Sequence, residues 1–524
     1  MRFHLNPKYH YYLYLFGIAL LIIGLPFSKF LMSLSQIILF VNWLWEGNLK
    51  NKIKLFINNK AALVVSSLLL LHFIGLFYTT DFDYAFKDIK IKLPLFLLPL
   101  IFSTSPPVSK ALFNRFLQLF IATIITASFF SCFILLGYTN IQILDIRNIS
   151  IFISHIRFAL LIALSILIAF YFLKESTTAF NKLIYFITII WLLTFLMLME
   201  SLTGLAALIA TVIIILLFNA FSSKNVGIKV LATSVTLIIV LLSIYSINVL
   251  LYSPVIEMHA VAIDLKDHTA QGHKYEHDLK NTQTENGYFI WINNCFSEME
   301  TAWNKRSKLD YNGKDLKQND LRYTLLRFLT SKGFTKDAAA INSLSSEEIK
   351  SIERGVANVN YQELSSTRNR INKTLWEIRV YKTTGNPNGH SLTQRFEYWK
   401  TAYSIIKQNY FIGVGTGDVQ QAFNEEYVKI NTPLDKRWRL RAHNQYLTIM
   451  VTFGVIGFIW FMITLIYPAY KQGVLFSYLY SSFLLIVLIS FLTEDTLETQ
   501  AGVTFYTFFN SLFLFINTCP KKEK

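Results

Sequence analysis

The chain has few cysteines and few charged residues, and both shortages narrow its class. Only 3 cysteines occur among 524 residues: Cys132 in an apolar run, Cys295 in the longest polar segment and Cys519 near the C-terminus. We therefore expect no intrachain disulfide outside the cytoplasm. Charged residues make up 16% of the chain, against ~25% in a soluble domain. This composition argues against a soluble globular protein.

The N-terminal apolar run lacks the small-residue cleavage site of a secretory signal peptide, and further apolar runs follow it. We expect it to remain as a membrane segment. The formal net charge of +16 would suggest a nucleic-acid partner in a soluble protein. In a membrane protein the position of the charges matters more than their sum, and we expect no nucleic acid partner.

Apolar runs are what the sequence has in abundance. About 20 apolar residues cross the hydrocarbon core of a bilayer as a helix. Runs of this kind cover 11–28, 30–46, 61–79, 91–104, 116–137, 151–173, 183–200, 202–220, 229–252, 444–467, 474–492 and 500–518. The run at 91–104 is short, and it could extend backwards through the amphipathic stretch from Asp83 to Lys92. We therefore predict an all-α integral membrane protein with about twelve transmembrane helices.

Lysine and arginine residues orient these spans. With both termini in the cytoplasm, most of the Lys and Arg near span ends lie inside, including the cluster from Lys50 to Lys60. This distribution follows the positive-inside rule, and the opposite orientation would violate it. The prediction divides the chain into nine N-terminal spans (1–252), an outside insert (253–390), a motif region (391–443) and three C-terminal spans (444–524).

The insert is polar and predicted to be mostly helical, with a possible capping pair, Ser345 and Glu348, at the start of one helix. It also contains His268, His273 and His277. On a helix His273 and His277 would share a face, and together with Glu276 they match the zinc pattern H-x-x-E-H. The match is short and its neighbourhood is highly charged. We interpret it as a solvated polar stretch, with metal binding as the alternative.

The motif region begins with an amphipathic pattern. Apolar and aromatic residues between Arg395 and Gln408 follow helical spacing and predict a helix. Gly413, Gly415 and Gly417 then mark a loop with little side-chain bulk. The pattern does not favour a phosphate-binding P-loop, because no Gly-Lys-Ser/Thr follows. The glycines indicate either a tight turn or the close approach of the backbone to a ligand.

Three arginines, Arg437, Arg439 and Arg441, come just before His443 and the tenth predicted span. A basic run beside a span commonly meets lipid headgroups. Outside the cytoplasm such a run is disfavoured, so a specific anionic partner is an equally good interpretation.

In these segments the chain resembles the O-antigen ligase family, which includes O-antigen polymerases and protein O-oligosaccharyltransferases. The matching elements, which precede three terminal spans, are Arg395-x-x-x-Trp399, the turn Gly413–Gly417, and His443-Asn444-Gln445-Tyr446-Leu447 opening a span with Gly454 and Gly457. The segment Leu492–Phe505, with Glu494, Asp495 and Glu498, looks like Bacteroidetes-type members. The resemblance covers the span layout and residues 391–510, and it leaves the insert without a role.

The resemblance implies a function and a location. Such enzymes take a glycan from undecaprenyl diphosphate and join it to an acceptor hydroxyl at the periplasmic face of the bacterial inner membrane. The acceptor is lipid A-core in ligases, the next repeat unit in polymerases, and Ser or Thr in protein transferases. The family resembles metal-independent, inverting, GT-C-like glycosyltransferases with many spans and a large periplasmic loop, so we expect no cofactor.

Arginines are the expected ligands of the departing diphosphate, since their planar fork stays charged and matches phosphate oxygens. Arg157 lies about six residues inside the sixth predicted span, where an unpaired charge is costly and suggests function. The alternative is that it snorkels to the interface. Arg395 is the second candidate, by its place in the family motif. Arg441, Arg439 and Lys92 would guide the diphosphate as substrate-binding residues.

His443 fits the general base that deprotonates the acceptor, because a neutral imidazole accepts a proton near pH 7. His155 is a weaker rival for this role. Asn444 is grouped with the substrate-binding residues, where it is expected to orient a neighbour or to cap the helix. Glu494, with its acidic neighbours, would position Arg157 or Arg395 or bind acceptor hydroxyls; a simple turn is the alternative. A lipid-glycan transporter is less well supported, because the central spans contain few charged residues.

Overall fold

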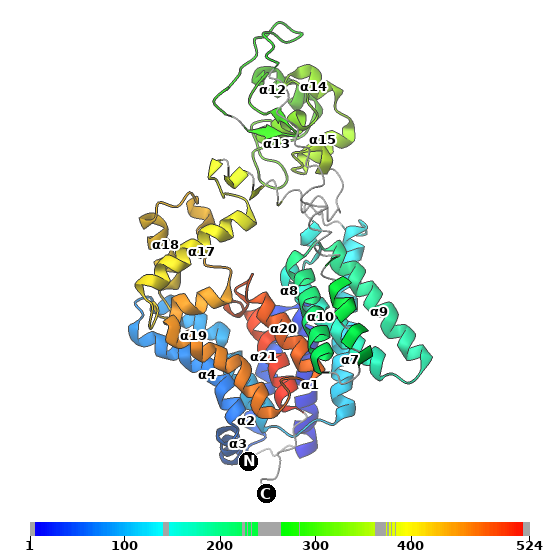
Figure 1. Ribbon diagram of the computed structural model, residues 1–524, viewed down its shortest axis with the longest axis vertical. Helices are drawn as coiled ribbons and strands as arrows, with labels where there is room; N and C mark the ends of the chain where they lie inside the picture. Colours follow the sequence, from blue (N-terminus) through cyan, green and yellow to red (C-terminus); the bar gives the residue numbers. More distant parts are fainter. Residues whose placement is uncertain are drawn as a thin grey trace. The chain divides into compact units, whose positions relative to one another are not determined.

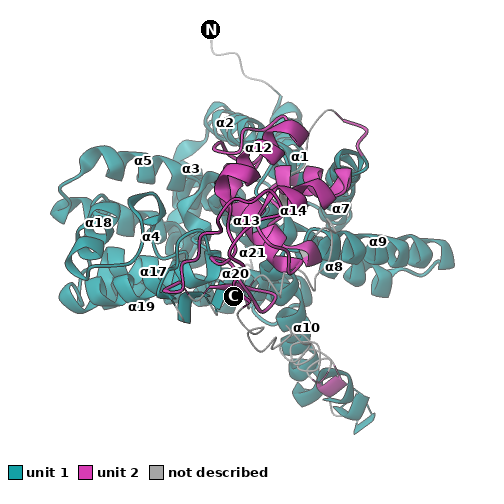
Figure 2. Cartoon of the chain, turned by 90° about the horizontal axis from the view of Figure 1, so that it is seen from above, with its two compact units in different colours: residues 1–136, 149–236, 377–524 teal, residues 137–148, 237–376 magenta. Residues whose placement is uncertain are grey.

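The computed structural model describes residues 6–139, 146–222, 264–361 and 377–516, apart from residues 282, 379 and 383, with scattered residues between 226 and 241 and residue 374. Two compact units divide the chain (Figure 2). Unit 1 comprises residues 1–136, 149–236 and 377–524, and unit 2 comprises residues 137–148 and 237–376. The 3-10 helix η2 (Ile146–Ile149) lies at the sequence boundary between them.

All the regular elements described in unit 1 are helices (Figure 1). Its N-terminal part contains α1 (Pro7–Phe27), α2 (Lys29–Trp45), α3 (Leu49–Asn58), α4 (Lys60–Ile74), η1 (Gly75–Tyr78), α5 (Phe82–Lys92), α6 (Pro94–Thr104), α7 (Lys110–Leu135), α8 (His155–Glu175), α9 (Ala179–Leu198) and α10 (Leu202–Ser222). Its C-terminal part contains α17 (Ser391–Gln408), α18 (Val419–Lys429), η4 (Lys436–Trp438), α19 (Gln445–Gln472), α20 (Tyr478–Ser490), η5 (Thr496–Glu498) and α21 (Gln500–Phe515).

Seven of the described helices are long and apolar enough to cross a membrane, or eight if the bent pair α2 and α3 counts as one span. The seven are α1, α4 with η1, α7, α8, α9, α10 and α19. The protein is thus a helical, multi-pass membrane protein. The described residues do not contain all of the twelve predicted spans, because α6, α20 and α21 are shorter than the ~20 residues that a bilayer requires. Most of the predicted span 229–252 lies outside the described residues.

Helix α19 is broken at Gly454, and the glycine-containing loop of the motif region fills the break. Gly454 has φ +61°, which interrupts the helical hydrogen bonds. The freed groups bond the loop instead: Val414 donates to Val451 O (2.9 Å), and Val455 donates to Tyr410 O (2.8 Å). A Cβ added to Gly413 or Gly454 would overlap backbone atoms across this contact. The glycine loop was interpreted either as a tight turn or as a close approach to a ligand; the close approach of Gly413 is made to the chain itself.

This contact gives a testable expectation for stability. Gly454→Ala should lower the free energy of unfolding by about 2–5 kcal/mol, because it combines an unfavourable φ with backbone overlap. Thermal unfolding of the purified protein in detergent measures the effect. Gly473→Ala is the matched control, since Gly473 also has positive φ (+70°) but open space around it, and it should cost only about 1 kcal/mol. Equal unfolding temperatures for the two variants would contradict the role given to the contact.

Unit 2 folds around its own apolar core. Its described elements are β1 (Thr284–Glu285) and β2 (Tyr288–Phe289), which pair antiparallel, α12 (Phe296–Arg306), α13 (Leu321–Ser331), α14 (Ala338–Ser343), α15 (Ser346–Glu353) and η3 (Val359–Tyr361). Trp303, Leu325 and Phe328 are fully buried at its centre. The predicted capping pair is confirmed, since Ser345 and Glu348 form both bonds of a capping box.

The helical histidine face, which was the alternative to a solvated polar stretch, does not form. His273 and His277 lie in a non-helical segment, because isolated bridges such as that of His268 with Lys274 hold the chain extended there. His277 Nδ1 accepts a hydrogen bond from the backbone N–H of Asn293 (3.0 Å). His273 instead pairs with Glu298 (2.8 Å). The pattern H-x-x-E-H therefore forms no helical metal site.

Candidate functional site

The site is built around the connection between α20 and α21. Three acidic residues, Glu494, Asp495 and Glu498, follow one another there, in and just before the short helix η5. Each carboxylate contacts a different group from the motif region, and all of these residues belong to unit 1. The acidic segment therefore contacts α5, α17, α19 and the loop that precedes α19.

Glu494 pairs with Arg395, and this is one of the two uses that the sequence suggested for it. Arg395 lies in the second turn of α17, and its Nη2 is 2.9 Å from Glu494 Oε1. Burial raises the pKa of Glu494 to about 6, although the positive charges of Arg395 and Arg157 lower it. The neighbouring guanidinium groups thus lower the pKa of Glu494, but by less than burial raises it.

Asp495 holds the backbone of the histidine motif. Its two carboxylate oxygens accept the N–H groups of His443 and Asn444, both at 3.0 Å. Oδ1 also accepts the hydroxyl of Thr448 (2.7 Å). Asn444 in turn caps α19 with its side chain, which accepts from Leu447 N, as predicted for a helix-capping residue. Asp495 therefore fixes the backbone at His443, where the loop leads into α19.

His443 adopts φ +46°, an uncommon conformation for a residue other than glycine. Its half-buried ring lies 5.7 Å from the ring of Tyr398, centroid to centroid. Within the residues that the structure describes, neither ring nitrogen makes a hydrogen bond. Burial lowers the pKa of His443; Asp495 opposes this, and Arg395, Arg441 and Arg157 lower it further. The imidazole is therefore neutral at pH 7 and able to accept a proton.

Glu498 joins two cations in a buried network. Its Oε2 is 2.8 Å from Lys92 Nζ and 3.2 Å from Arg441 Nη1, and its Oε1 accepts from Gln445 Nε2 (3.0 Å). Burial alone would raise the pKa of Glu498, but Lys92 and Arg441 outweigh it and hold that pKa well below its usual range. Burial alone would lower the pKa of Arg441, but Glu498 and other acidic neighbours raise it.

The structure changes the role expected of Lys92. Its side chain is 1% exposed, and its ammonium is also 2.6 Å from Asp88. The sequence had predicted that Lys92 binds substrate. Its ammonium group is enclosed by two carboxylates, so it has no surface that a substrate could contact. Lys92 instead orders Glu498, and through Glu498 it orders Arg441, whose guanidinium lies 5.7 Å from the ring of Tyr84.

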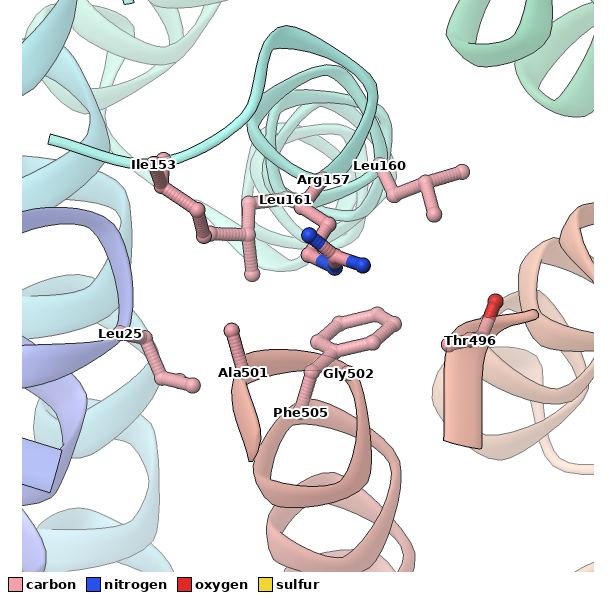
Figure 3. A pocket seen from close by; sticks show the side chains of 9 residues that line it. All are labelled: Leu25, Ile153, Arg157, Leu160, Leu161, Thr496, Ala501, Gly502 and Phe505. Atoms are coloured by element: carbon pink, nitrogen blue, oxygen red, sulfur yellow. The ribbon is translucent and has the colours of Figure 1, made fainter. Parts of the chain in front are cut away.

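Arg157 lies closer to the end of its helix than the sequence predicted. Helix α8 begins at His155 rather than at 151, so Arg157 is in the first turn and not six residues inside. It donates to Ser154 Oγ (3.2 Å). Figure 3 shows its guanidinium pointing from α8 across a small pocket towards Phe505 of α21. The pocket, of about 10 Å³, has room for about one water molecule.

Arg439 and Arg437 are not part of this cluster of contacts. Arg439 Nε donates to Leu434 O (3.1 Å), so its guanidinium stabilises its own loop. Arg437 is exposed and lies over the ring of Trp438. Of the three arginines before His443, only Arg441 meets the acidic segment in the described contacts. The substrate-binding role predicted for Arg439 thus gains no support from its position.

Two residues of the site were absent from the sequence prediction. Gln445 fixes the acidic segment from both sides, since it donates to Glu498 and accepts from Leu497 N (2.7 Å). Asp418 fastens the glycine loop to the chain before α5, accepting the N–H groups of Thr80 and Asp81. Burial alone would raise the pKa of Asp418, but these hydrogen bonds hold it below its usual value. Gln445 and Asp418 lie in or next to the family motifs, and this position is the sequence signal that could have identified them.

The carboxylates of the site pair with arginine and lysine side chains and accept hydrogen bonds from backbone N–H groups. Among the described residues, one group of three potential metal ligands is found, and it lies in unit 2: His273, Cys295 and Glu298. Glu298 there accepts from Thr269 and from Ala338 N, so hydrogen bonds already satisfy it. The charge that the unit 1 site offers to a ligand is that of its guanidinium groups.

Comparison with known proteins gives one result. A family model described as O-antigen ligase matches residues 339–462. The match begins in unit 2 and includes α17, α18 and the first part of α19, so it contains Arg395, Arg441 and His443. No curated protein matches the chain.

Proposed function

We propose that this chain, which carries an O-antigen ligase family domain, transfers a glycan from undecaprenyl diphosphate to an acceptor hydroxyl. Members of this family are ligases and polymerases that use lipid-linked glycans. The reaction proceeds at the periplasmic face of the inner membrane, with both termini of the chain in the cytoplasm. We take the ligase activity, with lipid A-core as the acceptor, as the leading form.

The observation that carries the proposal is that one short acidic segment holds two guanidinium groups and the backbone of His443: Glu494 pairs with Arg395, Asp495 accepts from His443 N, and Glu498 pairs with Arg441. Arg157, Arg395 and Arg441 come from three separate segments, and each lowers the pKa of His443 through its charge. The diphosphate is dianionic in the donor and gains a further negative charge as it leaves, so it needs such positive charge, and an acceptor hydroxyl needs a neutral base beside it. The site supplies both within one part of unit 1.

The arginines would act on the diphosphate. Guanidinium groups bind phosphate oxygens in a fork and remain charged at every physiological pH. Arg395 and Arg441 are held by carboxylates at 2.9 Å and 3.2 Å, which restricts their orientation before the substrate arrives. Both side chains are also partly exposed, at 21% and 17%.

His443 would accept the proton of the acceptor hydroxyl. As that proton moves to the imidazole, the acceptor oxygen forms a bond to the anomeric carbon of the donor. The bond from that carbon to the phosphate oxygen breaks, and the diphosphate leaves on its lipid with the charge neutralised by the arginines. Attack from the face opposite to the leaving group inverts the anomeric configuration. No metal is required by this scheme.

Deleting the gene tests the proposal and identifies the acceptor. A ligase deletion should remove long chains from lipid A-core while the polymer stays on its lipid carrier. A polymerase deletion should leave single repeat units on the core, and a protein transferase deletion should remove glycan from secreted proteins. Gel analysis of envelope glycans separates these outcomes, and a plasmid copy of the gene is the control. Unchanged glycans on lipid, core and protein would reject the proposed function.

A further inference from the structure

Unit 2 contains a second pocket, lined by aromatic and charged side chains. It lies between the segment that leads into α12 and the first half of α13, and its volume is about 310 Å³. This volume is at the lower limit for ligand sites, which span ~300–1,000 Å³. The lining residues are Trp291, Phe296, Asp320, Arg322, Tyr323 and Leu326. Such a site accommodates a small ligand.

Two aromatic rings form one fixed wall of this pocket. The ring planes of Trp291 and Tyr323 differ by 22°, with centroids 6.1 Å apart. Both rings are anchored at their polar ends by Gln283, whose Oε1 accepts from Trp291 Nε1 (3.1 Å) and from the Tyr323 hydroxyl (3.4 Å). Leu326 lies buried below them in the core of unit 2. The apolar wall is thus held in position before any ligand binds.

Charged groups of both signs stand beside the wall. Arg322 is exposed, and its guanidinium lies 5.6 Å from the ring centre of Phe296. Asp320 is also exposed and caps α13 through a hydrogen bond from Tyr323 N. A guanidinium only donates hydrogen bonds and a carboxylate only accepts them. The pocket therefore offers an aromatic wall, a donor group and an acceptor group together.

We propose that this pocket binds one sugar ring of the glycan that the enzyme transfers. A pyranose has a C–H face that packs on aromatic rings and a rim of hydroxyls that both donate and accept hydrogen bonds. A lipid tail would not use the charged pair. The identity of the ligand rests on the proposed function. With this ligand, the role of unit 2 is to bind the polymer.

The test uses the full-length protein in detergent and the polysaccharide that mild acid releases from the envelope of the same cells. Binding is measured by titration calorimetry and by saturation-transfer NMR. Trp291→Ala and Arg322→Ala should each weaken binding at least about ten-fold, since each removes one wall or one hydrogen-bonding group. Arg354→Ala is the matched control, because Arg354 is exposed in unit 2 and does not line the pocket, and it should bind as the wild type does.

Arg322→Ala also guards against misfolding, because its side chain is exposed whereas Trp291 packs on the core of unit 2. Unchanged affinity in both variants would overturn the proposal, and so would an equal loss in Arg354→Ala. His443→Asn separates the two claims. Loss of transfer with retained polysaccharide binding is the expected result, whereas full transfer would reject the role of His443 without touching the pocket.

Discussion

His443→Asn is expected to lower the rate of glycan transfer by about 10²–10⁴-fold, the usual contribution of a general base. Asparagine tolerates the left-handed backbone of this position, φ +46°, but its amide accepts no proton at neutral pH. Transfer is measured with purified protein, lipid-linked donor and acceptor in detergent. Asn431→Ala is the control for backbone strain, since Asn431 also has positive φ (+49°) in unit 1, and it should retain activity. Normal rates in His443→Asn would remove the base from the scheme.

The pH profile gives the same prediction a second readout. The pKa of His443 lies below its ordinary value of 6.5, so the neutral base persists until the pH falls below that value. The acid limb of kcat/KM should therefore lie below pH 6.5. Glu494, whose pKa is raised to about 6, titrates in the same region. Glu494→Gln distinguishes the two: the limb persists in this variant if His443 causes it and disappears if Glu494 does.

Glu498→Gln is expected to lower the free energy of unfolding by about 3–5 kcal/mol, the cost of removing one partner from a buried ion pair. Its carboxylate is 6% exposed and contacts both Lys92 and Arg441. Without it Arg441 loses its described carboxylate partner, whereas Lys92 retains Asp88. Thermal unfolding in detergent gives the change in stability.

A double variant tests whether the cost arises from the stranded guanidinium. Glu498→Gln combined with Arg441→Gln removes both charges and leaves the pair of Asp88 and Lys92 intact, so it should be more stable than Glu498→Gln alone. Lys429→Ala is the surface control: Lys429 is 63% exposed beside Glu426, and such pairs contribute ~0–1 kcal/mol. Strictly additive losses in the double variant would show that Glu498 and Arg441 are not coupled.

Several interpretations of single residues needed the tertiary structure. Arg157 was predicted to lie about six residues inside a span because apolar residues begin at 151, whereas α8 begins at His155 and Arg157 lies in its first turn. Lys92 was predicted to meet substrate, but folding encloses it between two carboxylates. The helical face that would join the histidines at 273 and 277, the alternative to a solvated polar stretch, does not form because the segment is not helical. Each error placed a residue by its local sequence, which does not reveal what packs against it.

The sequence by itself determined the class of the protein, because apolar runs and the charges between them depend on the bilayer and not on packing. It also determined the segments that form the site, through the motifs at Arg395, the glycine loop and His443. Only the tertiary structure decided which side chains meet. The partners of Arg395 and Arg441 follow them by 99 and 57 residues, and the glycine loop fills a break in another helix. Contacts between distant segments depend on how the helices pack, and no local pattern records that.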